Sequence, residues 1–189
     1  MPHLLLIAGW LWAQQPSPIP FFNPSFEDEP RASASPAGWT SYTPGSTPDI
    51  FPGAWGLQAP AADGKTCLGL VTRTDGSTED VSQNLQQPLQ AGVCYKFSIR
   101  LAHLPQYVGY NQAVRLRIWG GTEGRRTELL AGSPLIHHPD WREYTFEFIP
   151  DQEVRCITFE AYFGPGVMFR YKGNILLDLV SPIIRCDRA

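Results

Sequence analysis

Residues 92–103 read GVCYKFSIRLAH, and this stretch decides the fold class. Bulky apolar side chains alternate along it with polar or small ones. Successive side chains of a β-strand point to opposite faces of its sheet, so a period of two residues predicts a strand with one face in a core. The expected inward residues are Val93, Tyr95, Phe97, Ile99 and Leu101, and the expected outward residues are Cys94, Lys96, Ser98 and Arg100.

Similar short runs recur along the chain, and none has a helical period. They are FFNPSF (21–26), TCLGLVTR (66–73), EDVSQNLQ (79–86), AVRLRIW (113–119), WREYTFEF (141–148), VRCITFEAYF (154–163) and GNILLDLVSPIIR (173–185). With 17 glycines and 18 prolines among 189 residues, the chain is rich in turns. We expect one all-β domain over residues 21–187, a sandwich of two antiparallel sheets or jelly roll, because antiparallel sheets with one wet face give this alternation.

The chain ends and charges limit the class of protein. The first 13 residues, MPHLLLIAGWLWA, contain an apolar run too short to span a membrane and are expected to be a secretory signal, although a buried N-terminal segment is the alternative. A proline-rich lead follows at 14–20, and no second stretch is apolar enough to cross a bilayer. The formal net charge of −3 argues against general nucleic-acid binding, which needs a strongly basic face.

Four cysteines, at 67, 94, 156 and 186, agree with export. None lies in a CxxC pair or at a zinc-type spacing from a histidine. An even number of cysteines in an exported chain suggests disulfides, with free buried thiols as the alternative.

The order of several short motifs resembles the galactose-binding-like jelly roll. The motifs are NPSFE, GW, GKTCLGL, QNLQQPLQAGVCYKFSIRLA and a final LLDLVS. The chain is similar in these to non-catalytic carbohydrate-binding modules, and in STPDIF and GLQAP to secreted jelly-roll modules of bacterial outer-membrane and gliding-associated surface proteins. The resemblance covers roughly residues 21–184 and implies the same sandwich.

The resemblance also implies a structural calcium site where the first and last strands run side by side. Glu27 matches the N-terminal carboxylate ligand, Asp178 the ligand on the last strand, and Lys65 a position that offers its backbone carbonyl. Calcium prefers six to eight oxygen ligands, which fits such a set. The alternative is that both carboxylates are exposed or paired with arginine or lysine. In NPSFEDEP (23–30), Asp28 and Glu29 are then solvated turn residues.

Jelly-roll topology gives an expected disulfide pairing. The strands of Cys67 and Cys94 would run parallel and start at one end of the sandwich, whereas Cys156 and the end of the last strand would lie at the other. We therefore expect the pairs Cys67–Cys94 and Cys156–Cys186.

In similar modules one concave sheet holds sugar. Here it would contain the strands near 67–73, 93–103, 112–119 and 154–163. Aromatic rings stack on pyranoses and arginine forks bind carboxylates or sulfates, so an acidic or decorated polysaccharide is the expected ligand. An ordinary solvated face with cross-strand pairs such as Arg100–Glu160 is the alternative. The candidate ligand-binding residues are Arg100, Arg115, Arg117, Trp119, Glu160 and Tyr162.

These observations favour a secreted or periplasmic, non-catalytic module that binds carbohydrate at or outside the bacterial cell surface. No histidine, serine or carboxylate set reads as a catalytic site, and no G-x-S-x-G elbow is present. The alternative is a structural or adhesion component of a surface, secretion or gliding assembly that contacts another protein. A glycosidase is the weakest of the three hypotheses.

Overall fold

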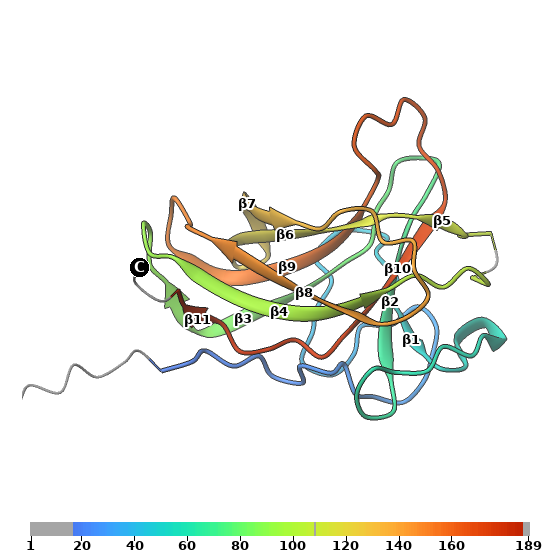
Figure 1. The fold of residues 1–189 in the computed structure, drawn as a ribbon, viewed down its shortest axis with the longest axis horizontal. Coiled ribbons are helices and arrows are strands. Elements are labelled where there is room, and N and C mark those ends of the chain that lie inside the picture. The colour runs from blue at the N-terminus through green and yellow to red at the C-terminus, as the bar shows by residue number, and fades with distance from the viewer. Residues whose placement is uncertain (1–16, 108, 187–189) are drawn as a thin grey trace, which may run out of the picture.

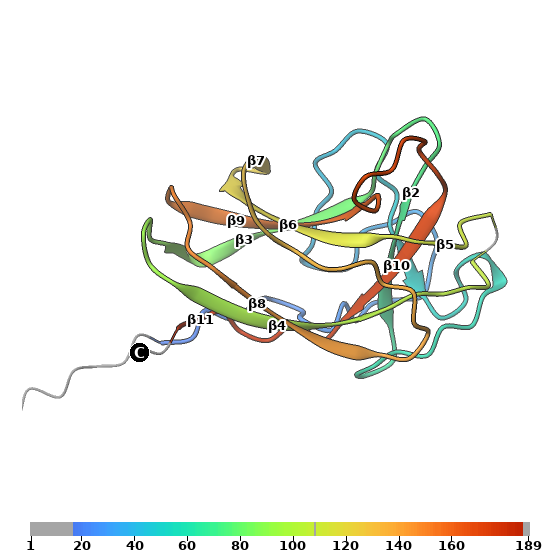
Figure 2. The ribbon, with the colours of Figure 1, turned by 45° about the horizontal axis from the view of Figure 1, so that its top comes forward.

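The computed structural model describes residues 17–107 and 109–186, and the expected signal peptide at 1–13 lies outside them. Two antiparallel sheets of seven and four strands pack face to face (Figures 1 and 2), which confirms the all-β sandwich. Within the described residues, helix is limited to one 3-10 turn, η1 (Ala54–Gly56).

The seven-stranded sheet has the order β1-β2-β10-β4-β11, with β8 paired to β4 and β5 paired to β10. Only the short β5–β10 pairing is parallel. Its strands are β1 (Asp49–Phe51), β2 (Cys67–Thr72), β4 (Tyr95–Ala102), β5 (Gln112–Ala113), β8 (Arg142–Phe148), β10 (Gly173–Asp178) and β11 (Ile184–Arg185).

The four-stranded sheet has the order β3-β9-β6-β7, and all its pairings are antiparallel. Its strands are β3 (Asp80–Leu89), β6 (Arg115–Thr122), β7 (Arg125–Gly132) and β9 (Val154–Tyr162). Sequence alternation did not identify β7, because RRTELLAG lies at the sheet edge and buries none of its side chains fully.

The core between the sheets follows the predicted alternation. Tyr95, Phe97, Ile99 and Leu101 of β4 are all buried in it, opposite inward residues of β6 and β9 such as Ile118. A second apolar cluster, which includes Phe51, Val71 and Leu176, covers the other face of the seven-stranded sheet. Strand β10 is therefore buried on both faces, which explains why its sequence reads as an unbroken apolar run.

The N-terminal run FFNPSF does not form the expected strand. Asn23 and Phe26 have positive φ angles of 49° and 52°, so the chain turns here. Phe26 is nevertheless fully buried, with its ring centroid 4.9 Å from that of Trp39. The apolar side chains of this run therefore pack into the core although their backbone forms a turn and not a strand. Earlier in the chain, Ile19 of the lead pairs with Ile183 through two backbone hydrogen bonds of 2.8 and 2.9 Å.

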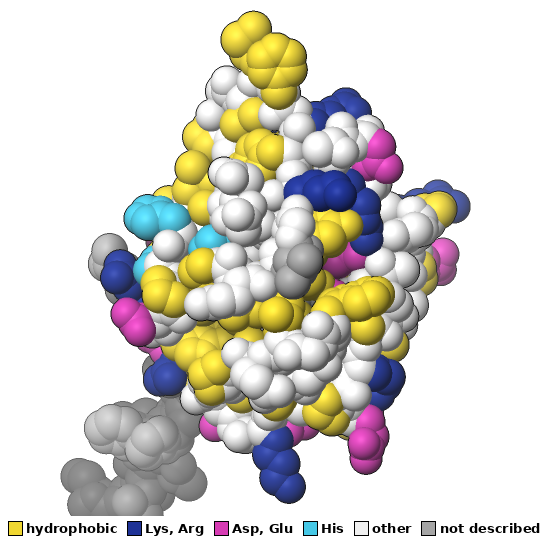
Figure 3. All heavy atoms as spheres, turned by 90° about the vertical axis from the view of Figure 1, so that its right-hand side faces the viewer, with side chains coloured by type: hydrophobic (Ala, Val, Ile, Leu, Met, Phe, Trp, Pro, Cys, Tyr) yellow, Lys and Arg dark blue, Asp and Glu magenta, His cyan; other side chains and the backbone are white. Residues whose placement is uncertain are grey.

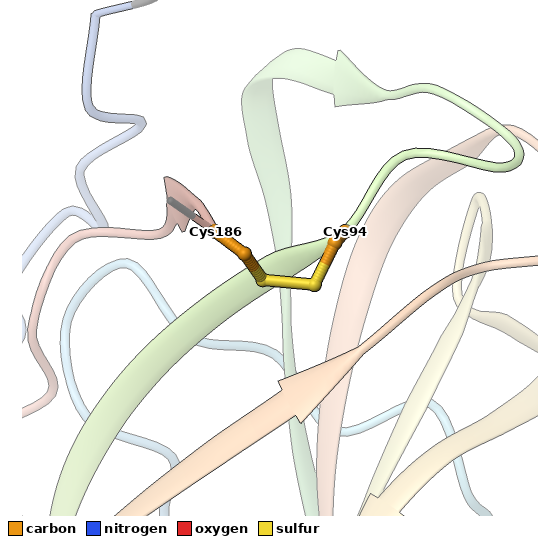
Figure 4. Close-up of a disulfide and its surroundings, with 2 residues drawn as sticks. All are labelled: Cys94 and Cys186. Atoms are coloured by element: carbon orange, nitrogen blue, oxygen red, sulfur yellow. A yellow bond between two sulfur atoms is a disulfide. The ribbon is translucent and has the colours of Figure 1, made fainter. Parts of the chain in front are cut away.

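The disulfide joins Cys94 to Cys186 (Figure 4). Cys67 and Cys156 are free, buried thiols. The expected pairs Cys67–Cys94 and Cys156–Cys186 are wrong. After β10 the chain continues antiparallel to β4 as far as β11, so the amide of Cys186 donates to the carbonyl of Cys94 at 3.0 Å.

Sheet register explains why Cys67 cannot reach Cys94. Leu177 of β10 pairs with Leu68 at the start of β2 and also with Leu101 at the end of β4. The two strand starts are thus offset by about six residues, roughly 20 Å at 3.3 Å per residue. Cys156 belongs to the four-stranded sheet and lies opposite Asn84 and Gly121.

Candidate functional site

The candidate site is the outer face of the four-stranded sheet. In β6 and β9 the side chains of Leu116, Ile118, Phe159 and Ala161 enter the core. Alternation therefore turns the neighbouring residues outward, as the sequence predicted. The outward residues brought together here are Arg115, Arg117 and Trp119 of β6 and Thr158, Glu160 and Tyr162 of β9.

The structure corrects one part of the expected binding face. Strands β2 and β4 belong to the other sheet, so the four expected strands do not share a surface. Arg100 pairs in register with Glu143 of β8 and Asp178 of β10. The Arg100–Glu160 pair, given as an example of the alternative, is therefore wrong, and the prediction of Arg100 as a ligand-binding residue of this face is wrong as well. The other five candidate residues lie together on the outer face of the four-stranded sheet.

Glu160 is the centre of a hydrogen-bond network on this face. Its Oε2 accepts a hydrogen bond of 2.7 Å from the Trp119 indole, its Oε1 accepts one of 2.9 Å from Thr78 Oγ1, and Oε1 also forms an ion pair of 2.6 Å with Arg126 Nη1. Glu160 is only 4% exposed. The network fixes the plane of the Trp119 ring, because the indole N–H can point in only one direction.

Asp80 of β3 lies beside this network and keeps one oxygen without a partner. Its Oδ2 accepts a hydrogen bond of 2.5 Å from Thr43 Oγ1 and lies 3.7 Å from Arg126 Nη2. Its Oδ1 is buried and has no hydrogen-bond partner among the described residues. Burial raises the pKa of Asp80 above its usual value. A buried polar atom without a partner is uncommon in folded proteins, so this oxygen marks an incomplete point in the network beside Glu160.

The segment 40–47 borders the face along β3. Thr40 and Ser82 form a two-bond bridge, and Ser41 and Ser46 bond to the backbone carbonyl of Asp80. The ring of Tyr42 lies against Gly124 in the β6–β7 turn, where an added Cβ would come within 2.4 Å of it. This segment covers one end of the face and buries its acidic residues.

Arginine and aromatic rings occupy the opposite end. The guanidinium carbon of Arg117 lies 3.1 Å from the centroid of the Tyr162 ring and 5.8 Å from that of Trp119. The guanidinium carbon of Arg115, the residue that pairs with Tyr162 in the sheet register, lies 5.7 Å from the centroid of the Tyr162 ring. Such cation–π contacts attract a guanidinium to the face of a ring without requiring a hydrogen-bond acceptor.

The expected calcium ligands meet at one loop. Glu27 Oε1 accepts the amides of Lys65 and Thr66 at 2.8 and 3.2 Å, and Asp178 Oδ2 accepts those of Ala62 and Asp63 at 2.6 and 2.9 Å. An added Cβ on Gly64, with its φ of 65°, would lie 2.1 Å from Glu27 Oε1, so the close approach requires glycine. Lys65 thus contributes its N–H to Glu27. Calcium at this place stays a prediction.

A pocket of about 410 Å³, which we call the Glu79 pocket, lies outside the β1–β2 edge and was not predicted from the sequence. Figure 3 looks onto this end and shows hydrophobic side chains over its middle, below a group of Lys and Arg side chains. Trp55, 63% exposed, bonds Asp49 through its indole at 3.0 Å. Glu79 forms an ion pair with Arg73 and accepts bonds from Thr47 Oγ1 and the Val71 amide. Burial raises the pKa of Glu79 to about 7.

Sequence reasoning missed Asp80, Thr43 and Arg126 in the candidate site. The alternation of EDVSQNLQ does carry a signal for Asp80, because Val81 enters the core and its neighbours must face outward. Thr43 and Arg126 have no such signal. They reach the site through an irregular segment and an edge strand.

No protein-family model matches the sequence, and no curated protein matches it. Solved structures do match. The CBM22-1 xylan-binding domain of Xyn10C from Paenibacillus barcinonensis is 16% identical with a TM-score of 0.54, over 87% of this chain and 93% of that one. An apo cyclase from Fischerella sp. is 14% identical with a TM-score of 0.60, over 91% and 98%.

The K1 cleaved adhesin domain of Lys-gingipain from Porphyromonas gingivalis W83 is 16% identical with a TM-score of 0.52, over 86% of this chain and 96% of that one. The chain thus shares the β-sandwich fold of carbohydrate-binding modules and adhesin domains, as the resemblance implied. Because a cyclase has the same fold, the fold does not decide between binding and catalysis.

Proposed function

We propose that the protein is an exported, non-catalytic module that binds a polysaccharide on the outer face of its four-stranded sheet. The observation that carries this proposal is the fixed Trp119 ring beside Glu160, Arg126 and the unpartnered Asp80 Oδ1. Pyranose rings stack on aromatic side chains, and their hydroxyls bond to planar carboxylate and guanidinium groups. The xylan-binding domain with the same fold supports this direction.

The carboxylates of the face are poor candidates for catalysis. Glu160 accepts two hydrogen bonds, from Thr78 and Trp119, and forms an ion pair with Arg126, so both of its oxygens already have partners. Asp80 is 2% exposed and already bonds Thr43. A glycosidase needs one carboxyl group that donates a proton and another that attacks or activates water. We therefore propose that these acids orient side chains and ligand.

Export is proposed from two features. The apolar run from Leu4 to Trp12 has the length of a secretory signal, and the Cys94–Cys186 disulfide is of a kind that persists in oxidising compartments. Among the described residues, no helix is long and apolar enough to cross a bilayer. We place the protein at or outside the bacterial cell surface.

Affinity electrophoresis in gels containing xylan, β-glucan, pectin or sulfated galactan tests the proposal, followed by calorimetry on the strongest ligand. We expect Trp119→Ala to weaken binding tenfold or more, because an aromatic anchor is lost. Trp119→Phe, which keeps a ring, should retain most of the affinity. Trp55→Ala is the matched control from the Glu79 pocket. Equal affinities of the Trp119→Ala and Trp55→Ala proteins, or no retardation by any polysaccharide, would contradict the proposal.

A protein-binding role is the alternative, and the loop between β9 and β10 favours it. Val167, Met168 and Phe169 are 43%, 88% and 81% exposed there, and this loop projects beyond the sheets (Figures 1 and 2). Exposed apolar side chains in one loop are typical of a contact surface. A silent polysaccharide panel, together with a cross-linked partner that is lost when Met168 and Phe169 become serine, would favour this role.

A further inference from the structure

Another pocket, of about 330 Å³, continues the candidate site at its arginine end. It lies between the end of β9, the loop 163–170 and the turn that joins β2 to β3. Arg115, Arg117 and Arg170 line it, together with the Tyr162 ring, and no acidic residue does. The chain as a whole carries a net charge of −3, so this pocket concentrates positive charge against the general trend.

The arginines of this pocket differ from the others in their partners. Arg31, Arg73, Arg126 and Arg155 each form an ion pair with a carboxylate. Arg115 and Arg117 form no ion pair within the described residues, and the Nε of each is buried without a hydrogen-bond acceptor. A guanidinium stays charged at any physiological pH, and a buried donor without an acceptor costs free energy.

Contacts without an acceptor hold these two arginines in place. Arg115 and Arg117 lie 5.7 and 3.1 Å from the centroid of the Tyr162 ring. Their N–H groups therefore stay available while their positions are fixed. Such a fixed arrangement reduces the side-chain entropy that the protein would otherwise lose when a ligand binds.

Arg170 closes the pocket from the loop. Its Nη1 donates 2.8 Å to the carbonyl of Asp75. Gly76 makes this approach possible, because an added Cβ would lie 2.0 Å from that nitrogen. The carboxylate of Asp75, the acid of this turn, bonds the amide and hydroxyl of Ser77, each at 2.8 Å, and does not neutralise Arg170.

We propose that this pocket is a subsite for an anionic group on the sugar chain, a carboxylate of a uronic acid or a sulfate ester. The subsite rests on the proposed polysaccharide binding, since Arg115, Arg117 and Tyr162 belong to both surfaces. Guanidinium forks match the oxygens of both anions. Neutral sugar units contact Trp119 while the anionic group occupies the arginine pocket.

Calorimetry on matched pairs of polysaccharides tests the subsite. The pairs are polygalacturonate with its carboxyl-reduced form, and a sulfated galactan with its desulfated form; neutral xylan is the uncharged reference. We expect one charged member to bind at least tenfold more tightly than its neutral partner, and the preferred pair identifies the anion. Affinity for it should fall as sodium chloride rises from 50 to 300 mM, because ion pairs are screened by salt.

Arg170→Gln should remove this preference, with roughly tenfold weaker binding of the charged polymer and unchanged binding of the neutral one, and Arg115→Gln should weaken binding of the charged polymer more than that of the neutral one. Arg155→Gln, on the same strand as Tyr162 but outside the pocket, is the matched control. Melting curves check that each variant is folded, and Arg115→Lys, which keeps the charge but not the fork, should recover only part of the affinity.

The outcomes separate the two proposals. Equal affinity for charged and neutral members of both pairs, with Trp119→Ala still weakening binding, would overturn the anionic subsite alone. A loss of neutral and charged binding to the same extent in Arg115→Gln would also overturn it. No binding to any polysaccharide in the set would overturn the proposed function and the subsite together.

Discussion

The turn between β2 and β3 borders two pockets whose arginines differ in their partners. On one side Arg73 forms an ion pair with Glu79, whose oxygens also bond Thr47 and the Val71 amide. On the other side Arg115 and Arg117 have no acceptor for their buried Nε atoms among the described residues. In the first pocket the arginine and the carboxylate thus pair with each other and stabilise the fold. In the second pocket the guanidinium groups have no carboxylate partner, which leaves them free to bind an anionic ligand.

The largest expected effect is on stability in the first pocket. Arg73→Ala leaves Glu79, 1% exposed, as a buried carboxylate without its cation. We expect a loss of about 3 kcal/mol in the free energy of unfolding at pH 8, since removing one partner of a buried pair leaves an uncompensated charge. Urea unfolding followed by tryptophan fluorescence measures it.

Arg117→Ala is the matched variant in the second pocket, and it should change the free energy of unfolding by less than about 1 kcal/mol, because no ion pair is broken. It should still weaken binding of the anionic polymer. A large loss of stability in Arg117→Ala, or a negligible one in Arg73→Ala, would show that the two pockets are not divided in this way.

The second prediction concerns pH. The pKa of Glu79 rises from 4.5 in a free chain to about 7 in the fold because the carboxyl group is buried. Between these values the folded protein binds more protons than the unfolded chain, so stability falls as pH rises from about 4.5 to 7. The upper bound for one group is about 3 kcal/mol. Asp178, whose pKa burial raises to about 6, acts in the same direction.

Urea unfolding at pH 5, 6, 7 and 8 checks this slope, and Glu79→Gln should flatten most of it. Polysaccharide binding should not follow the same curve, because the arginines of the second pocket do not titrate in this range. Stability that rises from pH 5 to pH 7 would contradict the burial argument for Glu79.

The alternation of GVCYKFSIRLAH and its relatives was enough to predict the sandwich, its core and the outward row from Arg115 to Tyr162. The period of two fixes which face a side chain joins, but not which strands share a sheet. Arg100 was therefore placed on the wrong sheet, and Cys67 was paired with Cys94 although sheet register separates them.

The pockets depend on irregular segments that alternation cannot describe. Trp55 reaches its pocket with a φ of 56° in a turn, and Gly76 admits Arg170 with a φ of 91°. Arg126 lies on an edge strand next to a register shift, so its side chain direction could not be read from the sequence. Contacts between segments far apart in the chain set all three positions.

The Glu27–Asp178 cluster is intermediate between the two pockets and gives the smallest expected effect. Backbone amides donate hydrogen bonds to both carboxylates. Among the described residues, however, no arginine forms an ion pair with either of them, so their negative charge has no guanidinium to balance it, just as the arginines of the second pocket have no carboxylate. Calcium would compensate it with further oxygens from the 62–66 loop. After EDTA treatment, millimolar calcium should raise the melting temperature by a few degrees, corresponding to about 1–2 kcal/mol. Asp178→Asn should abolish this gain in melting temperature, whereas Asp151→Asn, at an exposed position, should keep it. If the wild-type protein shows neither calorimetric heat nor a gain in melting temperature, the backbone amides alone balance the two carboxylates and the calcium prediction is wrong.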